Sequence, residues 1–279
     1  MNKSAVFLVI FLLVLLQIPS FFGSTVGTPV IEDFILETNN SQVIERGNHI
    51  VSGGLFLDGN SSLTFLNTEI TFGENEEAEY RISGDSKLTA INCSIIWESP
   101  RSIQVSGNAS VELVNVELYS TYEVNNRTYF IAGMGLSDNT KISVEGSKIG
   151  FVRLAENAEC NISGSHVGAF GTQSRKKAEL SNCTIEQLLI VYERSRVQIN
   201  QSLTGRHERF SQSQLVKAGD TSYDFEMFNS TILNPPNIYI TDGKLEAKDT
   251  KLDMVYIEGD SAIEAQDTNI YYLRLKGYS

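Results

Sequence analysis

Three segments with one pattern follow each other along the chain: ISVEGSKI (residues 142–149), CNISGSHV (residues 160–167) and AELSNCTI (residues 178–185). Each contains alternating apolar and polar residues, then Gly or Asn, and ends on an aliphatic residue. The segments start 18 residues apart. Alternation with a period of two is typical of β-strands, and a fixed repeat length indicates stacked structural units.

The pattern occurs ten times. The closing aliphatic residues are Ile70, Ile95, Leu118, Ile149, Val167, Ile185, Leu203, Ile232, Leu252 and Ile270. The residues three positions earlier are Asn67, Asn92, Asn115, Gly146, Gly164, Asn182, Asn200, Asn229, Asp249 and Asp267. Asn, Gly and Asp tolerate a left-handed backbone or cap a turn, so we expect a bend at this point of every unit.

Short strands separated by tight bends cannot pair with their sequence neighbours, so they pair with the equivalent strand of the next unit. The sequence therefore predicts an all-β fold, a single-stranded parallel β-helix solenoid of about ten coils with an 18-residue basic repeat. Each coil rises by one inter-strand distance, about 4.8 Å. A right-handed coil is favoured because parallel crossovers are nearly always right-handed. A left-handed hexapeptide solenoid, which fits the same repeat length, is the alternative.

The array resembles the right-handed parallel β-helix repeats of the pectin-lyase-like superfamily over about residues 38–279. The segment VIERGNHIVSGGLFLDGNSSLTFLNTEITF (residues 43–72) is similar to the start of many such secreted or surface domains. The superfamily includes lyases, hydrolases, adhesins and inert scaffolds. The resemblance therefore implies the fold and no single activity.

The N-terminal sequence is typical of a secretory signal. Lys3 provides a positive charge, residues 5–16 are apolar without interruption, and small residues follow. We interpret residues 1–27 as a signal peptide, which predicts an extracellular or cell-surface protein. An uncleaved membrane anchor is the alternative, although the apolar run is shorter than the roughly 20 residues of a membrane span. Residues 28–57 are then an entry or capping segment, and residues 58–279 the repeats.

Composition excludes some partners and constrains the cysteines. The formal net charge is −12 and no basic run contains interleaved aromatic residues, which argues against nucleic-acid binding. Cys93, Cys160 and Cys183 are odd in number and lie in dissimilar contexts. We expect small buried thiols rather than a disulfide framework.

Insertions between units predict a binding surface. They follow Ile70, Ile95, Leu118, Leu203 and Ile232, always between a closing aliphatic residue and the next unit. Loops on one side of a solenoid commonly bind ligands. The ligand-binding candidates are Tyr119, Tyr122, Arg127, Tyr129 and Phe130, which suit a sugar ring or a protein surface. A loop folded back onto the coil is the alternative.

Catalysis is the second hypothesis. Glu226, Glu246 and Glu264 are expected at one outward position of three successive coils, beside Lys244 and Lys248. Stacked carboxylates could serve a lyase or glycoside hydrolase that acts on an acidic polysaccharide. A solvated face of alternating charges is the preferred interpretation, so no catalytic residue is assigned.

The sequence indicates neither a metal nor a cofactor. The three histidines, His49, His166 and His207, have no partners at metal-ligand spacing. Phosphate-binding glycine loops and nucleophile-elbow motifs are absent from the sequence.

Nine N-x-[ST] sequons beyond residues 1–27 raise the question of glycosylation. Asn92, Asn182, Asn200 and Asn229 occupy the recurrent bend, where we expect inward side chains that bond the neighbouring coil. Asn60 and Asn108 in outer turns, and Asn126 in an insertion, are the glycosylation candidates.

The sequence hypothesis is a non-catalytic, exported surface or envelope protein that displays loops to a glycan or a surface protein. Contact with a membrane is expected only through the N-terminal segment, if it is not cleaved. The last unit closes at Ile270 with a second strand after it, and nothing beyond Ser279 covers its edges. End-to-end self-association at this coil and a longer gene product are the two explanations.

Overall fold

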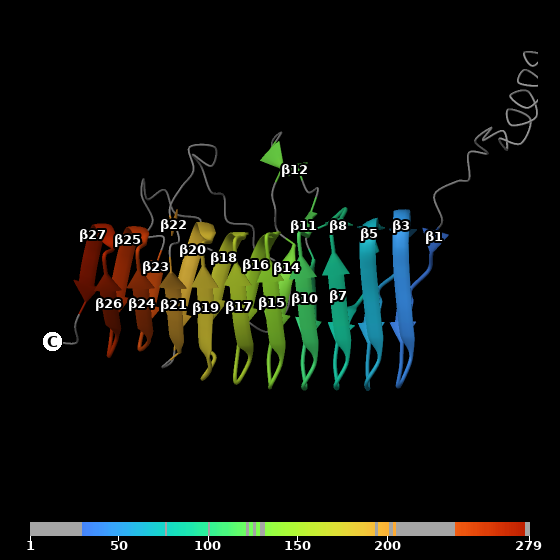
Figure 1. Ribbon diagram of the computed structural model, residues 1–279, viewed down its shortest axis with the longest axis horizontal. Helices are drawn as coiled ribbons and strands as arrows, with labels where there is room; N and C mark the ends of the chain where they lie inside the picture. The colour runs from blue at the N-terminus through green and yellow to red at the C-terminus, as the bar shows by residue number, and fades with distance from the viewer. Residues whose placement is uncertain are drawn as a thin grey trace, which may run out of the picture.

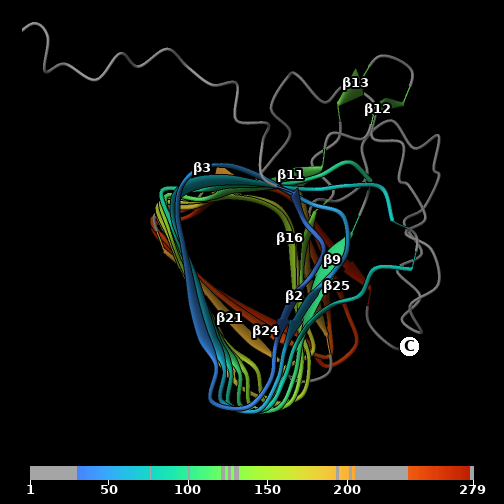
Figure 2. The ribbon, with the colours of Figure 1, turned by 90° about the vertical axis from the view of Figure 1, so that its right-hand side faces the viewer.

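The computed structural model describes residues 30–75, 77–99, 101–120, 123–124, 127–128, 132–192, 195–200, 203–204 and 238–276. Within these ranges the regular elements are strands, and nearly all of them belong to one parallel solenoid, which forms the rod of Figure 1. Viewed along the rod, three faces enclose the core (Figure 2). We call them faces A, B and C in the order in which each coil forms them.

Face A contains the strands that precede the recurrent bend. They are the first halves of β3 (Ser41–Val51) and β5 (Ser62–Phe72), then β7 (Lys87–Ile91), β10 (Ser110–Val114), β15 (Lys141–Glu145), β17 (Glu159–Ser163), β19 (Lys177–Ser181), β21 (Arg196–Asn200), β24 (Lys244–Lys248) and β26 (Ala262–Gln266). These ten strands correspond to about nine complete turns.

Face B follows the bend. It contains β1 (Val30–Ile31), the second halves of β3 and β5, β8 (Ser94–Trp97), β11 (Glu117–Ser120), β22 (Leu203–Thr204) and the first parts of β16 (Lys148–Leu154), β18 (His166–Thr172), β20 (Thr184–Tyr192), β25 (Lys251–Glu258) and β27 (Asn269–Lys276).

Face C contains the remaining parts of these five long strands. With them lie β2 (Phe34–Leu36), β4 (Leu55–Leu57), β6 (Tyr80–Ile82), β9 (Ser102–Val105), β14 (Gly133–Leu136) and β23 (Ile238–Thr241). Only β12 (Glu123–Val124) and β13 (Arg127–Thr128) lie apart among the described strands, as an antiparallel hairpin outside the rod (Figure 2).

Register confirms the 18-residue repeat. Ile142 pairs with Cys160, and Cys160 pairs with Ala178. The bends are also stacked, since the Gly146 amide donates to the Ser163 carbonyl and the Gly164 amide to the Ser181 carbonyl, each at 3.0 Å. Eight of the expected bend residues have the left-handed backbone: Asn67, Asn92, Asn115, Gly146, Gly164, Asn182, Asp249 and Asp267. The parallel β-helix prediction is therefore confirmed, while the hand of the coil stays a prediction.

One coil is a residue longer than predicted. The register shifts in β20, where Ile185 pairs with Val167 but Leu188 pairs with Ala169. Because of this extra residue, Thr204 rather than Leu203 lies beside Ile185. The same shift pairs Asn200 with Ser181, one position before the bend. The predicted bend and closing positions at Asn200 and Leu203 were therefore wrong by one residue.

A second difference concerns the unit that closes at Ile232. β21 pairs directly with β24, so no coil lies between them. The segment 225–232 lies outside the described residues. At the other end, the predicted entry segment 28–57 contains β3, which pairs with β5 in parallel register and forms the first coil.

The core is apolar from end to end of the rod. Most of its largest members form an aromatic cluster near the N-terminal coils: Phe34, Phe65, Phe72, Tyr80 and Trp97. The three cysteines are free and buried, as predicted. Burial, with a smaller contribution from Cys183, raises the pKa of the Cys160 thiol. Such a thiol stays protonated and unreactive.

The bend asparagines do not point inward as expected. Asn67, Asn92 and Asn115 are exposed, and the side chains bond each other. Each Nδ2 of Asn92 and Asn115 donates to the Oδ1 of the preceding asparagine at 3.1 Å. Asn182 is exposed as well. The left-handed backbone turns the bend residue outward, and the residue after it, such as Cys93, fills the core instead.

Candidate functional site

A groove of about 540 Å³ lies along the outer surface of face A, over β7, β10, β15, β17 and β19. Alternation places every second residue of these strands outside, as Ile142 and Val144 of β15 are buried whereas Lys141 is exposed. The charged residues that line the groove are Lys87, Glu112, Lys141, Glu159, Lys176, Lys177 and Glu179. Four ammonium groups thus share three carboxylates.

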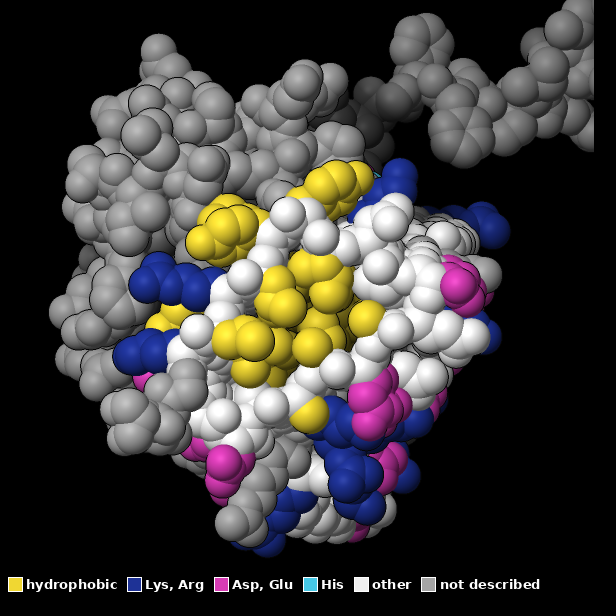
Figure 3. Space-filling view, turned by 90° about the vertical axis from the view of Figure 1, so that its left-hand side faces the viewer, with side chains coloured by type: hydrophobic (Ala, Val, Ile, Leu, Met, Phe, Trp, Pro, Cys, Tyr) yellow, Lys and Arg dark blue, Asp and Glu magenta, His cyan; other side chains and the backbone are white. Residues whose placement is uncertain are grey.

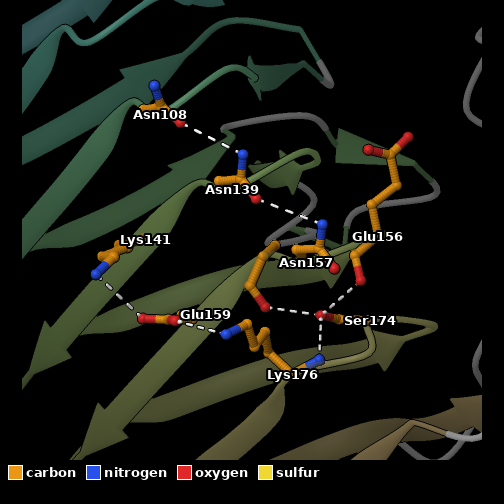
Figure 4. Close-up of polar contacts among 9 residues, drawn as sticks. Asn108, Asn139, Lys141, Glu156, Asn157, Glu159, Ser174 and Lys176 are labelled. Atoms are coloured by element: carbon orange, nitrogen blue, oxygen red, sulfur yellow. Dashed lines mark hydrogen bonds and ion pairs between the residues drawn. The ribbon is translucent and has the colours of Figure 1, made fainter.

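The centre of the groove contains a carboxylate between two lysines. Glu159 lies 3.3 Å from the Lys141 Nζ and 3.6 Å from the Lys176 Nζ (Figure 4). The three side chains are 42%, 66% and 54% exposed, respectively. Exposed ion pairs of this kind are worth only about 0–1 kcal/mol each. An anionic ligand can therefore replace Glu159 as the partner of either lysine at little cost.

Two more ion pairs lie along the groove. Lys87 contacts Glu112 at 2.8 Å, and Lys177 contacts Glu179 at 2.6 Å. Beyond the groove, the column continues with Arg196, which is exposed and pairs with Lys177 in the backbone register. This side of face A is therefore rich in cations although the formal charge of the chain is −12.

The turn before β19 holds Lys176 in place. The hydroxyl of the fully buried Ser174 donates to the Ala158 carbonyl at 2.8 Å and to the Glu156 carbonyl at 3.2 Å (Figure 4). The Lys176 amide in turn donates to the Ser174 Oγ at 3.1 Å. Through Ser174, these hydrogen bonds connect the Lys176 backbone to the preceding coil. The solenoid therefore fixes the backbone position from which the Lys176 side chain extends.

A ladder of asparagine side chains lies at the corner where face C returns to face A, which also contains the Ser174 turn. Asn139 donates to Asn108, and Asn157 donates to Asn139, each at 3.4 Å (Figure 4). Two glycosylation candidates belong to this corner. The Nδ2 of Asn108 donates to Asp85 at 2.9 Å, and that of Asn60 donates to Asn39. Both asparagines are exposed, and their glycosylation stays a prediction. Asn126 lies outside the described residues.

Three of the five predicted insertions lie at one corner, because the chain leaves face B after β5, β8 and β11 and enters face C with β6, β9 and β14. The insertions after Leu203 and Ile232 lie outside the described residues. Tyr119 lies in β11 beside Ile96 and is half-buried. Burial, followed by the carboxylates of Glu117 and Glu69, raises the pKa of its phenol.

The other members of this predicted loop site stay a prediction. Arg127 begins β13, and its side chain is not described. Tyr122, Tyr129 and Phe130 lie outside the described residues.

The expected row of three glutamates is corrected by the register. Glu246 pairs with Glu264 as predicted, but its other neighbour is Gln198. Glu226 lies outside the described residues. Because β21 pairs directly with β24, Gln198 occupies the position beside Glu246 at which the sequence predicted Glu226.

Lys244 neutralises the remaining pair. Its Nζ lies 2.7 Å from Glu264 and 3.2 Å from Glu246. Hydrogen bonds to Glu264 and then to Glu246 raise the pKa of the lysine. Because both carboxylates share one ammonium group, this arrangement fits the solvated face of alternating charges better than a row of catalytic carboxylates.

Within the described ranges, no group of three or more His, Cys, Asp and Glu side chains is placed to hold a metal ion. A search of the same residues finds no helix with the length and hydropathy of a membrane span. The chain matches no protein-family model, and neither curated proteins nor solved structures contain a similar chain at significant similarity. Any proposal for the function of this protein therefore rests on the geometry of the described residues.

The lysine groove was not identified from the sequence. Lys141, Glu159 and Lys177 are 18 residues apart, so the repeat length already placed them in one column. The run SRKK (residues 174–177) was a second signal.

Proposed function

We propose that the protein is a non-catalytic, exported surface or envelope solenoid that binds a glycan bearing negative charges along face A. The observation that carries the proposal is the groove in which Lys87, Lys141, Lys176 and Lys177 outnumber their carboxylate partners. Export rests on the signal-like residues 1–27. Membership of the pectin-lyase-like superfamily is part of the same proposal and rests on the repeat pattern.

Rigid spacing supports binding of a linear ligand. Successive coils lie about 4.8 Å apart, and the groove spans five strands of face A. Contacts that are individually weak then act together, because the scaffold holds them at fixed positions and the second contact becomes intramolecular. Serine and asparagine side chains between the charges, Ser110, Ser143 and Asn161, provide hydrogen-bonding groups for sugar hydroxyls.

The test is binding of acidic polysaccharides, with polygalacturonate and dextran sulfate as probes and dextran as the neutral comparison. We expect the double variant Lys141→Gln, Lys176→Gln to bind the acidic probes about tenfold more weakly, since two exposed ionic contacts of about 0.7 kcal/mol each are lost. Binding should also weaken as salt is raised, because exposed charges are screened. Titration calorimetry at two salt concentrations measures both effects.

Lys248→Gln is the matched control. Lys248 is an exposed lysine of face A that does not line the groove, so its replacement should leave affinity unchanged. Because Lys248→Gln removes one charge and the double variant two, a control loss half that of the double variant in free energy would reduce the effect to net charge and contradict a defined site. Release of shortened polysaccharide that is abolished by Glu246→Gln would favour the lyase or hydrolase hypothesis instead.

A further inference from the structure

The coil formed by β26 and β27 exposes side chains that the rest of the solenoid buries. Leu273 is 44% and Leu275 68% exposed. Their counterparts one coil earlier, Val255 and Ile257, are only 0% and 7% exposed. Figure 3 looks onto this end of the rod and shows an apolar patch framed by the backbone of the coil. We call it the β27 end.

The opposite end is built differently. In the first coil, Gln42 and His49 occupy the positions at which the next coil has Leu63 and Ile70. The His49 Nε2 lies 3.2 Å from the Arg46 carbonyl, so this ring has a local hydrogen bond. Two of the inward positions of β3 are thus polar, whereas the other two, Ile44 and Val51, remain apolar. Stacking this end on the β27 end would desolvate these polar groups against leucines, which is costly.

The β27 end also offers a free strand edge. Among the described strands, β26 pairs only with β24, and β27 only with β25. The backbone groups that point away from those neighbours are a template for another strand. A second copy, related by a two-fold axis perpendicular to the rod, presents the same edge in the antiparallel direction. Such a contact is isologous, so it closes on itself.

Charge selects one orientation of that axis. On face A, β26 carries the exposed Glu264, whereas on face C β27 carries the exposed Arg274 and Lys276. An axis through the corner between faces A and C places β26 of one copy opposite the face C part of β27 in the other. Glu264 of each copy then faces Arg274 and Lys276 of the other. Glu264 already contacts Lys244 at 2.7 Å and Lys276 already contacts Glu258 at 2.8 Å, so these charges extend existing pairs across the contact. An axis through the middle of face A would instead oppose Glu264 to itself.

We propose that two copies of this chain dock through their β27 ends, related by a two-fold axis, and bury Leu273 and Leu275 at the contact. The last coil of one copy then covers the last coil of the other, as a further coil of the same chain would. The inference is independent of glycan binding, because the groove over β7 to β19 lies elsewhere on the rod.

Sedimentation equilibrium over a dilution series tests the association with the full chain. We expect a dimer, and the double variant Leu273→Lys, Leu275→Lys should raise its dissociation constant at least about 100-fold, because two apolar side chains lose their burial. Ile35→Lys is the control, since Ile35 is a 58% exposed apolar residue near the opposite end. It should leave the dimer intact, and circular dichroism checks that both variants are folded.

Cross-linking tests the orientation. The native cysteines are buried, so an oxidised mixture of a Glu264→Cys chain and an Arg274→Cys chain should form the mixed disulfide and little of either homodimer. A monomer at all concentrations, or rods that lengthen with concentration, would overturn the proposal. A negative result in this test does not contradict glycan binding, because a monomer can also bind a glycan. A failure to bind acidic polysaccharides would likewise not contradict the dimer.

Discussion

Replacement of Phe72 by alanine is expected to lower the free energy of unfolding by about 3–5 kcal/mol, the usual loss when a large buried aromatic side chain is removed. Phe72 is completely buried in the middle of the aromatic cluster. Its ring stacks on Trp97 with centroids 5.1 Å apart and meets the edge of Tyr80 at the same distance. Aromatic pairs add about 0.5–1.5 kcal/mol each to the burial of area.

The stacked rings are spread over successive coils, so the cavity weakens the contacts between coils. Phe72 ends β5, Tyr80 begins β6 and Trp97 ends β8. In a solenoid, each unit contacts only its neighbours, and stability is a sum of local terms. We therefore expect hydrogen exchange to accelerate in β5 to β8 first, while β17 and β19 stay protected at low denaturant.

Denaturant unfolding followed by circular dichroism measures the loss. Ile35→Ala is the control, because Ile35 is more than half exposed and should cost less than about 0.5 kcal/mol. Similar losses for the two variants would contradict the packing described for the aromatic cluster. An even acceleration of exchange along the rod would contradict the local character of the effect.

The repeat explains why so much of the fold was predictable. A left-handed bend favours Gly, Asn or Asp, although the first coil has Arg46 there, and an inward position favours an apolar residue. Because both preferences recur from coil to coil, many weak signals combine into one strong prediction. The position of Gly146, Gly164 and Asn182 in one column confirms this reasoning.

The errors arose where a coil departs from its neighbours. The extra residue in β20 moved the register by one, while Asn200 and Leu203 still fitted the bend and closing positions of the 18-residue pattern. The polar Arg196 and Gln198 at the strand positions of this pattern were the sign of this slip, which places Val197 and Ile199 inward. The orientation of Asn92 depends on the direction of Cβ in a left-handed bend, which residue type does not reveal. The site required side chains from several coils, and Lys176 reaches the groove only because the Ser174 turn positions it.

The last prediction concerns the corner at which face C returns to face A. Gly59, Gly84 and Gly107 lie one above another there, each with a positive φ, +68°, +69° and +74°. A Cβ on Gly84 would lie 2.5 Å from the Gly59 carbonyl oxygen and 2.9 Å from the Gly59 amide nitrogen. Both are backbone atoms of the adjacent coil, so relief of the clash would require the two coils to separate.

We expect Gly84→Ala to lower the free energy of unfolding by at least about 2 kcal/mol, since a left-handed alanine costs about 1 kcal/mol before any clash is counted. Gly164→Asn is the matched control. Gly164 has a φ of +58°, and the nearest atom to its Cβ position, the Gly146 amide nitrogen, is 3.8 Å away. Asparagine occupies this bend in other coils with the same backbone, so its cost should stay within about 0.5 kcal/mol.

Urea unfolding of both variants compares the two corners directly. If Gly84→Ala proved as mild as Gly164→Asn, the close approach of the coils at this corner would be wrong. Because a left-handed alanine itself costs about 1 kcal/mol, the part of the difference beyond that amount measures the close approach of the coils.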